Sequence, residues 1–130
     1  MISKAETLQD KLTKFHSAFG HPIDESFPPP NHKIHNLKKL RRDLIKEEYH
    51  EVMDAIKNKS DEEVLKELCD LVYVCVGMCV SYGWDFDIAF NRVHNSNMSK
   101  LNDEGKPIYR EDGKVLKSDN YKPPDRKSVV

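Results

Sequence analysis

The chain has 130 residues, a length that suits one domain with a modest hydrophobic core. Its 21 Lys and Arg residues nearly balance its 22 Asp and Glu residues, so we do not expect a nucleic acid polymer as its main partner. The longest apolar run, Leu71 to Val80, is too short to cross a bilayer, which argues against a membrane partner.

The beginning of the chain predicts a helix followed by a loop. Apolar side chains at helical spacing mark a helix from about Lys4 to Phe19: Leu8, Leu12, Phe15 and Phe19. Gly20 and Pro22 are expected to end it. The stretch from His21 to Asn31 holds three consecutive prolines, so it is expected to be an extended loop.

Two long helices are expected next. The second helix runs from about His32 to Lys57, and its expected buried side consists of Leu37, Leu40, Leu44, Val52 and Ile56. Ser60 with Glu63 fits a capping box, so a third helix is expected from about Asp61 to Tyr82. Its second half, Leu71 to Val80, is apolar on all sides and rich in valine, which makes a β-strand the competing interpretation. We favour a helix, because the segment continues unbroken from a charged, capped start.

A helix that is apolar on every side must be buried on every side, and in a chain this small that predicts a subunit interface. The three cysteines all lie in this third helix, at positions 69, 75 and 79. An odd number of cysteines in one apolar segment indicates buried thiols in a reducing compartment, and the N-terminus lacks an apolar signal region. We therefore expect a cytoplasmic protein.

The end of the chain predicts a fourth helix and a polar tail. Asp85 is a suitable cap, and the expected inward stripe is Phe86, Ala89, Phe90 and Val93. Within the tail, Pro107 to Lys117 fits a short hairpin around Asp112 and Gly113, and the end from Pro123 is expected to be loosely ordered. The sequence thus predicts an all-α, four-helix bundle-like fold, in which a helical region of residues 1–101 and a tail of residues 102–130 belong to the same domain.

Two acidic pairs carry the strongest chemical signal of the chain. Glu48 with Glu51, and Glu67 with Asp70, stand three residues apart on consecutive predicted helices, so each pair projects from one face. Two packed helices can bring the four carboxylates to one point. Such a cluster would be repulsive unless it held a hard divalent cation with oxygen ligands, Mg²⁺ or Mn²⁺.

A helical wheel at about 100° per residue supports this interpretation. Glu48, Glu51 and Arg41 fall in the same sector as the leucines of the second helix. A charged solvent face would instead lie opposite the leucines, and it remains the alternative for each acidic pair alone. Burying two unpaired carboxylates would cost several kcal/mol each, which a bound metal would avoid.

Further residues suggest phosphoryl chemistry on a nucleotide. Asn97 and Lys100 prolong the stripe of the fourth helix, where they can meet phosphate; the alternative for these residues alone is a fraying helix end with a favourable cation. Downstream, Lys114 and Lys117 flank the predicted hairpin, and Tyr121 can stack on a base. Glu47 lies at the edge of the acidic face, where it would act as a general base or simply be solvated.

At these residues the sequence resembles a known superfamily. Leu40 to Glu51, followed by Glu67 to Asp70, resembles the EExxE…ExxD signature of the all-α nucleoside triphosphate pyrophosphohydrolases. That superfamily includes MazG-like proteins, phosphoribosyl-ATP pyrophosphohydrolases and the all-α dUTPases and dCTPases. Asn95 to Lys100 resembles the Asn-x-x-Lys phosphate-binding element, and Asp112 to Lys117 with Tyr121 resembles tails of one branch.

The resemblance implies Mg²⁺ on the four carboxylates and the triphosphate on Asn97 and Lys100. It also implies cleavage between the α and β phosphates, and assembly into homodimers or homotetramers. The leading hypothesis is therefore a Mg²⁺-dependent nucleotide pyrophosphohydrolase whose substrate-binding residues include Arg41, Lys114, Lys117 and Tyr121. The alternative is a non-catalytic helical dimerisation or regulatory domain that keeps a structural ion site. The sequence leaves the base and the sugar of the substrate open.

Overall fold

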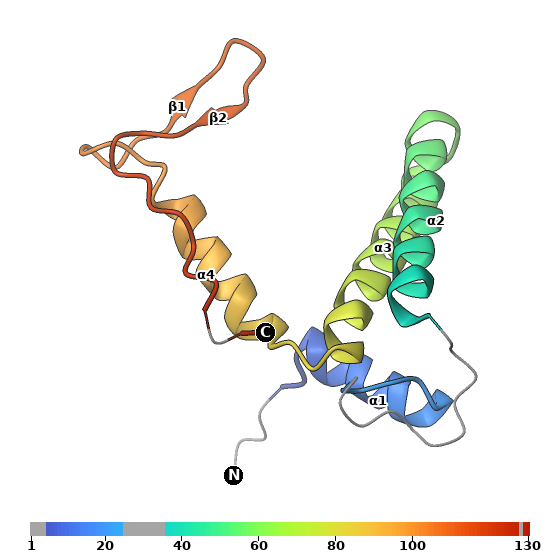
Figure 1. Ribbon diagram of the computed structural model, residues 1–130. Coiled ribbons are helices and arrows are strands. Elements are labelled where there is room, and N and C mark those ends of the chain that lie inside the picture. The colour runs from blue at the N-terminus through green and yellow to red at the C-terminus, as the bar shows by residue number, and fades with distance from the viewer. Residues whose placement is uncertain (1–4, 25–35, 128) are drawn as a thin grey trace. The chain divides into compact units, whose positions relative to one another are not determined.

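The computed structural model describes residues 5–24, 36–127 and 129–130. The expected loop from residue 21 to 31 and the start of the second helix lie partly outside the described residues. The chain forms two compact units, Met1–Trp84 and Asp85–Val130, and each is described by itself. Helices dominate the first unit, and the only strands among the described residues form one short hairpin in the second (Figure 1). The predicted all-α fold is therefore confirmed.

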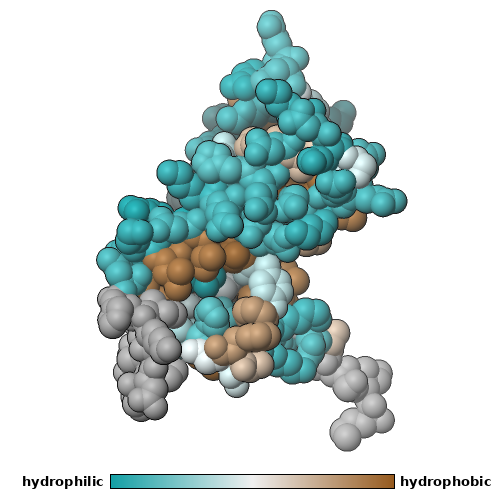
Figure 2. Space-filling model, turned by 90° about the vertical axis from the view of Figure 1, so that its right-hand side faces the viewer, coloured by the Kyte–Doolittle hydropathy of each residue, from teal (hydrophilic) through white to brown (hydrophobic). Residues whose placement is uncertain are grey.

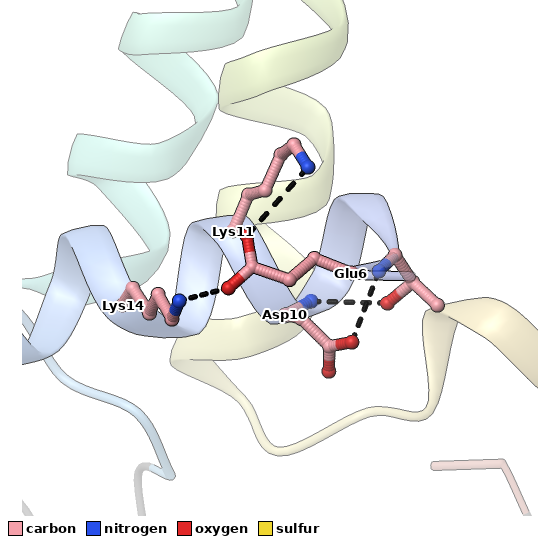
Figure 3. A network of polar contacts seen from close by, with 5 residues as sticks. Glu6, Asp10, Lys11 and Lys14 are labelled. Atoms are coloured by element: carbon pink, nitrogen blue, oxygen red, sulfur yellow. Dashed lines mark hydrogen bonds and ion pairs between the residues drawn. The ribbon is translucent and has the colours of Figure 1, made fainter. Parts of the chain in front are cut away.

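Helix α1, Leu8–Phe19, begins with a capping box. The backbone N–H of Asp10 donates to the Thr7 hydroxyl at 3.1 Å, and the Thr7 N–H donates back to the Asp10 carboxylate at 2.9 Å. Figure 3 shows this exchange beside Glu6, which pairs with Lys14 and, at 3.7 Å, with Lys11. These contacts satisfy N–H groups that the first turn of a helix leaves free.

Helices α2, Leu37–Asn58, and α3, Asp61–Ser81, lie side by side as an antiparallel pair, and α1 packs on α3 (Figure 1). Only two residues connect the pair, and Ser60 caps α3 by accepting the Glu63 N–H at 3.4 Å. The valine-rich run is helical throughout, so the β-strand alternative is excluded. The packing of α2 against α3 therefore fixes how far apart the side chains of the two helices lie and which of them face one another.

The core of the first unit is smaller than the sequence suggested. Its buried apolar residues are Leu12, Val52, Ala55, Val76 and Val80. Ile56 and Phe19, both predicted to face inward, are 59% and 67% exposed. Both lie near a helix end. The helical period gives a face, but it does not say how far along that face a neighbour extends.

The second unit consists of helix α4, Phe86–Met98, and the segment that follows it. Asp85 caps α4 by accepting the Ile88 N–H at 3.0 Å, as the sequence predicted. Strands β1, Ile108–Tyr109, and β2, Val115–Leu116, form the expected antiparallel hairpin. Gly113 takes a positive φ of 89° in its turn, a conformation that glycine adopts without strain.

The end of the chain runs back along α4, contrary to the expectation of a loosely ordered tail. The Ser96 hydroxyl donates to the Lys122 carbonyl at 2.7 Å, and the Lys122 N–H donates to the Ser99 hydroxyl at 2.9 Å. Farther along, Arg92 donates to the Lys127 carbonyl at 2.5 Å. Polar composition suggested disorder here, but the tail is held through its backbone groups, which composition does not reveal.

Apolar side chains remain exposed on α3. Leu65 is 63% exposed, Val72 44% and Tyr73 39%, whereas Val76 and Val80 are buried within the chain itself. Apolar patches also interrupt the mostly hydrophilic face that Figure 2 shows. Among the described helices, none combines the length and the apolar character that a membrane span requires. The expected burial of α3 on every side is thus only partly met by this chain alone.

Candidate metal centre

The four predicted carboxylates come together between α2 and α3. One oxygen from each of Glu48, Glu51, Glu67 and Asp70 lies within 4.8 Å of the others. Each helix supplies a pair three residues apart, and the antiparallel packing brings the two pairs to the same level. Glu51 is exposed and the other three are half-buried, so the cluster lies at a solvent-accessible edge of the helix pair.

Charge repulsion and desolvation act together on this cluster. Burial and the neighbouring Glu51, Asp70 and Glu67 raise the pKa of Glu48 from 4.5 to about 7. One oxygen of Glu48 and one of Glu67 are buried and have no hydrogen-bond partner among the described residues. A buried acceptor without a donor is costly, so these two oxygens are suited to a cation.

A lysine balances part of the charge on α3. The Lys66 ammonium lies 2.7 Å from Asp70 and 3.4 Å from Glu67, which raises the pKa of Lys66 further above its usual range. No ammonium or guanidinium of the described residues pairs with Glu48 or Glu51. The donor set of four carboxylates, two of them with orphaned oxygens, therefore fits a hard divalent cation such as Mg²⁺ or Mn²⁺.

The two other predicted residues on α2 have different surroundings. Glu47 is exposed and stands beside Glu48, outside the group of four. Arg41 is only 3% exposed, and its Nη2 donates to the Val74 carbonyl on α3 at 2.7 Å. Arg41 thus lies inside the first unit, as its position in the leucine sector predicted.

The predicted phosphate- and base-binding residues belong to the second unit. Asn97 is exposed in the last turn of α4, and Lys100 is half-buried just beyond it, with its N–H donating to the Asn97 carbonyl at 3.1 Å. Lys114 is exposed in the hairpin, and the Lys117 ammonium lies 4.5 Å from the centre of the Tyr121 ring. Their roles toward a substrate stay predictions.

Sequence reasoning missed a buried titratable residue, His16. It is 2% exposed, and its Nδ1 lies 2.8 Å from the Pro22 carbonyl. Burial is the main cause that lowers the pKa of His16. The available signal was its position four residues after Leu12 on the apolar face of α1, where a titratable side chain is unusual.

The chain matches the phosphoribosyl-ATP pyrophosphohydrolase family over residues 12–97, which span all four carboxylates and Asn97. The chain belongs to this family. Membership in this family indicates a hydrolase of the nucleotide pyrophosphohydrolase class. The match also confirms, at the level of the superfamily, the resemblance seen in the sequence.

This phosphoribosyl-ATP pyrophosphohydrolase family member is also similar to "Uncharacterized protein L479" of Acanthamoeba polyphaga mimivirus. The two are 31% identical over 120 residues, which cover 89% of this chain and 44% of the viral protein. The chain thus spans less than half the length of that relative.

Proposed function

We propose that this protein is a Mg²⁺-dependent nucleoside triphosphate pyrophosphohydrolase, which releases a nucleoside monophosphate and pyrophosphate by cleavage between the α and β phosphates. The observation that carries the proposal is the cluster of four carboxylate oxygens within 4.8 Å, inside the region of the chain that matches the family. The two orphaned carboxylate oxygens support it further, because a purely structural surface would pair or solvate them.

In this proposal the four carboxylates, Glu48, Glu51, Glu67 and Asp70, hold the cation. A divalent cation supplies neutralisation of the phosphate oxygens and activation of water. Mn²⁺ accepts the same oxygen ligands and would replace Mg²⁺. Lys66 must give up some of its contact with Asp70 when the cation binds, and its exposure makes that movement inexpensive.

Glu47 is our candidate for the general base. It stands next to Glu48 and is exposed, so its carboxylate is free to accept a proton from a water molecule at the edge of the cluster. Asn97 and Lys100 would bind the phosphates, and Lys114, Lys117 and Tyr121 would contact the rest of the nucleotide. We also propose a homodimer or homotetramer, supported by the exposed apolar side chains of α3.

The metal assignment predicts a selective loss of activity. Asp70→Asn should reduce pyrophosphate release by roughly a hundredfold or more, as expected when a main electrostatic contact is lost, and should weaken Mg²⁺ binding measured by calorimetry. The helical circular dichroism signal should not change, because Asn fits the same space. Glu62→Gln, on the first turn of α3 outside the cluster, is the control and should behave as wild type.

The same assay separates the proposal from its alternative. A panel of nucleoside triphosphates, with Mg²⁺ and with a chelator, should show turnover only with the metal. A protein that binds Mg²⁺ but releases no pyrophosphate from any member of the panel would be a non-catalytic domain with a structural ion site. Full activity of Asp70→Asn would show that the cation is held elsewhere.

A further inference from the structure

Lys66 is the only basic residue within the 21 residues of α3, and it stands at the border of the carboxylate cluster. Its ammonium lies 2.7 Å from a carboxylate oxygen of Asp70 and 3.4 Å from one oxygen of Glu67. The other oxygen of Glu67 is buried and has no hydrogen-bond partner among the described residues. Lys66 therefore balances two of the four carboxylates and leaves a buried oxygen of the cluster without a donor.

The stability of α3 gives little reason for a lysine at this position. A lysine four residues before an aspartate is the weaker orientation of a helical ion pair, because the reverse order agrees better with the helix dipole. Lys66 also lies in the first half of α3, nearer to the positive end of that dipole. Its side chain is 66% exposed, and exposed ion pairs contribute little to folding. The charge of the cluster explains the position of Lys66 better than the stability of the helix does.

The cluster and its proposed substrate together need more positive charge than one divalent cation supplies. Four ionised carboxylates carry four negative charges, of which a cation such as Mg²⁺ balances two. A phosphate chain brings further negative charge to the same place. Among the described residues, Lys66 alone has a charged group that forms ion pairs with the cluster. It is therefore positioned to supply the missing charge.

The side chain of Lys66 is also suited to change its partner. Lysine carries a compact charge on a flexible four-carbon stem, and its three N–H groups accept phosphate oxygens from many directions. Because Lys66 is exposed, little packing holds its ammonium at Asp70 and Glu67. A cation that takes these two carboxylates would release the ammonium at the border of the site, beside the phosphates that the cation neutralises.

We propose that Lys66 is a mobile counter-ion of this site and a further phosphate-binding residue; this rests on the proposed function. Without a metal, its ammonium neutralises Asp70 and Glu67 and competes with the divalent cation for them. With the metal bound, the same ammonium moves to the phosphate chain of the substrate. Lys66 thus opposes the binding of one ligand and favours the binding of the other.

The test measures both ligands on one variant. Lys66→Gln removes the charge and keeps most of the side chain. It should bind Mg²⁺ alone about threefold more tightly in calorimetry, because no ammonium competes for the two carboxylates. In saturating Mg²⁺ it should bind tripolyphosphate about tenfold more weakly, the range expected when a hydrogen bond to a charged group is lost.

Two further variants serve as controls. Lys66→Arg keeps the positive charge and should stay close to wild type for both ligands. Lys57→Gln removes the same charge from the exposed last turn of α2, where the ammonium pairs with none of the four carboxylates. It should change neither affinity. Circular dichroism checks that all three variants keep their helices.

Opposite changes for the two ligands would support the inference. Equal weakening of both would show that Lys66 only holds the carboxylates in place, and unchanged tripolyphosphate binding would show that its ammonium does not reach phosphate. Either result overturns the inference. Both titrations are independent of turnover. If no nucleotide is hydrolysed while the affinities change as expected, the pyrophosphohydrolase proposal fails and the role of Lys66 stands; hydrolysis with unchanged affinities in Lys66→Gln would mean the reverse.

Discussion

Among single residues, Glu48 has the charge that depends most on its neighbours. Three other carboxylates surround it, and one of its oxygens is buried without a partner. Both effects favour the protonated form of Glu48 and raise the pKa of its carboxyl group to about 7. The unfolded chain has no such cluster, so this carboxyl group would lose its proton near 4.5 there. The stability of the metal-free protein should therefore depend on pH through Glu48.

The sign of this dependence follows from proton binding. Between pH 4.5 and about 7 the folded Glu48 binds more protons than the unfolded one, so its contribution to the unfolding free energy falls as pH rises. His16 acts in the opposite direction, because burial lowers its pKa and it destabilises the fold at acid pH. The comparison of wild type with Glu48→Gln isolates the effect of the carboxylate.

We expect Glu48→Gln to gain thermal stability relative to metal-free wild type at pH 8 and to show little difference at pH 5. Thermal unfolding in the presence of a chelator measures this, with His16 unchanged in both proteins. Saturating Mg²⁺ should reverse the order at pH 8, because only the wild type keeps the full ligand set. A constant difference across this pH range would show that Glu48 does not titrate as described.

Among the elements, those set by local sequence were predicted well. The caps Ser60 and Asp85 and the turn at Gly113 act within a few residues, and the structure confirms all three. The acidic pairs were also found, because three-residue spacing fixes a helix face. The contact of Arg41 with the Val74 carbonyl joins residues 33 positions apart and depends on how α2 and α3 slide along each other. Periodicity carries no information on that register.

The tail that returns along α4 is the element that the sequence described least well. Ser96 is 7% exposed and its hydroxyl bonds the Lys122 carbonyl. Ser96→Ala should leave that carbonyl with only the long 3.5 Å contact from the Ser99 hydroxyl, at a cost of about 1 kcal/mol. Amide hydrogen exchange of residues 118–127 should become faster, whereas Asn91→Ala, exposed on the same helix, should not change it. Exchange at the rate of an unfolded peptide in wild type would contradict the described tail.

For the whole molecule, the exposed apolar side chains of α3 determine what to expect of assembly. The sequence predicted that the entire run from Leu71 to Val80 lies in a subunit interface. The structure buries Val76 and Val80 within one chain, so only the region near Val72 and Tyr73 remains available to a second copy. An aspartate at position 76 or 80 would therefore disturb the fold first, and it does not test association.

Val72→Asp is the informative change, since Val72 is 44% exposed. It should shift the sedimentation profile from a dimer or tetramer to a monomer with helical content preserved, because burying the new charge in an apolar interface is unfavourable. Val115→Asp, 43% exposed in the hairpin, serves as the control and should not change the profile. A wild-type protein that sediments as a monomer at micromolar concentration would contradict the proposed oligomer.

The return of the tail along α4 also has a consequence for biosynthesis. The N–H of Asp85, at the start of α4, donates to the carbonyl of Val129 at 2.9 Å. The ribosome must therefore make the helix, the hairpin and the returning segment before that contact can form. At roughly 5–20 residues per second, α4 waits for seconds before the returning segment can bond to it. On the nascent chain, α4 should therefore be the last helix to become protected.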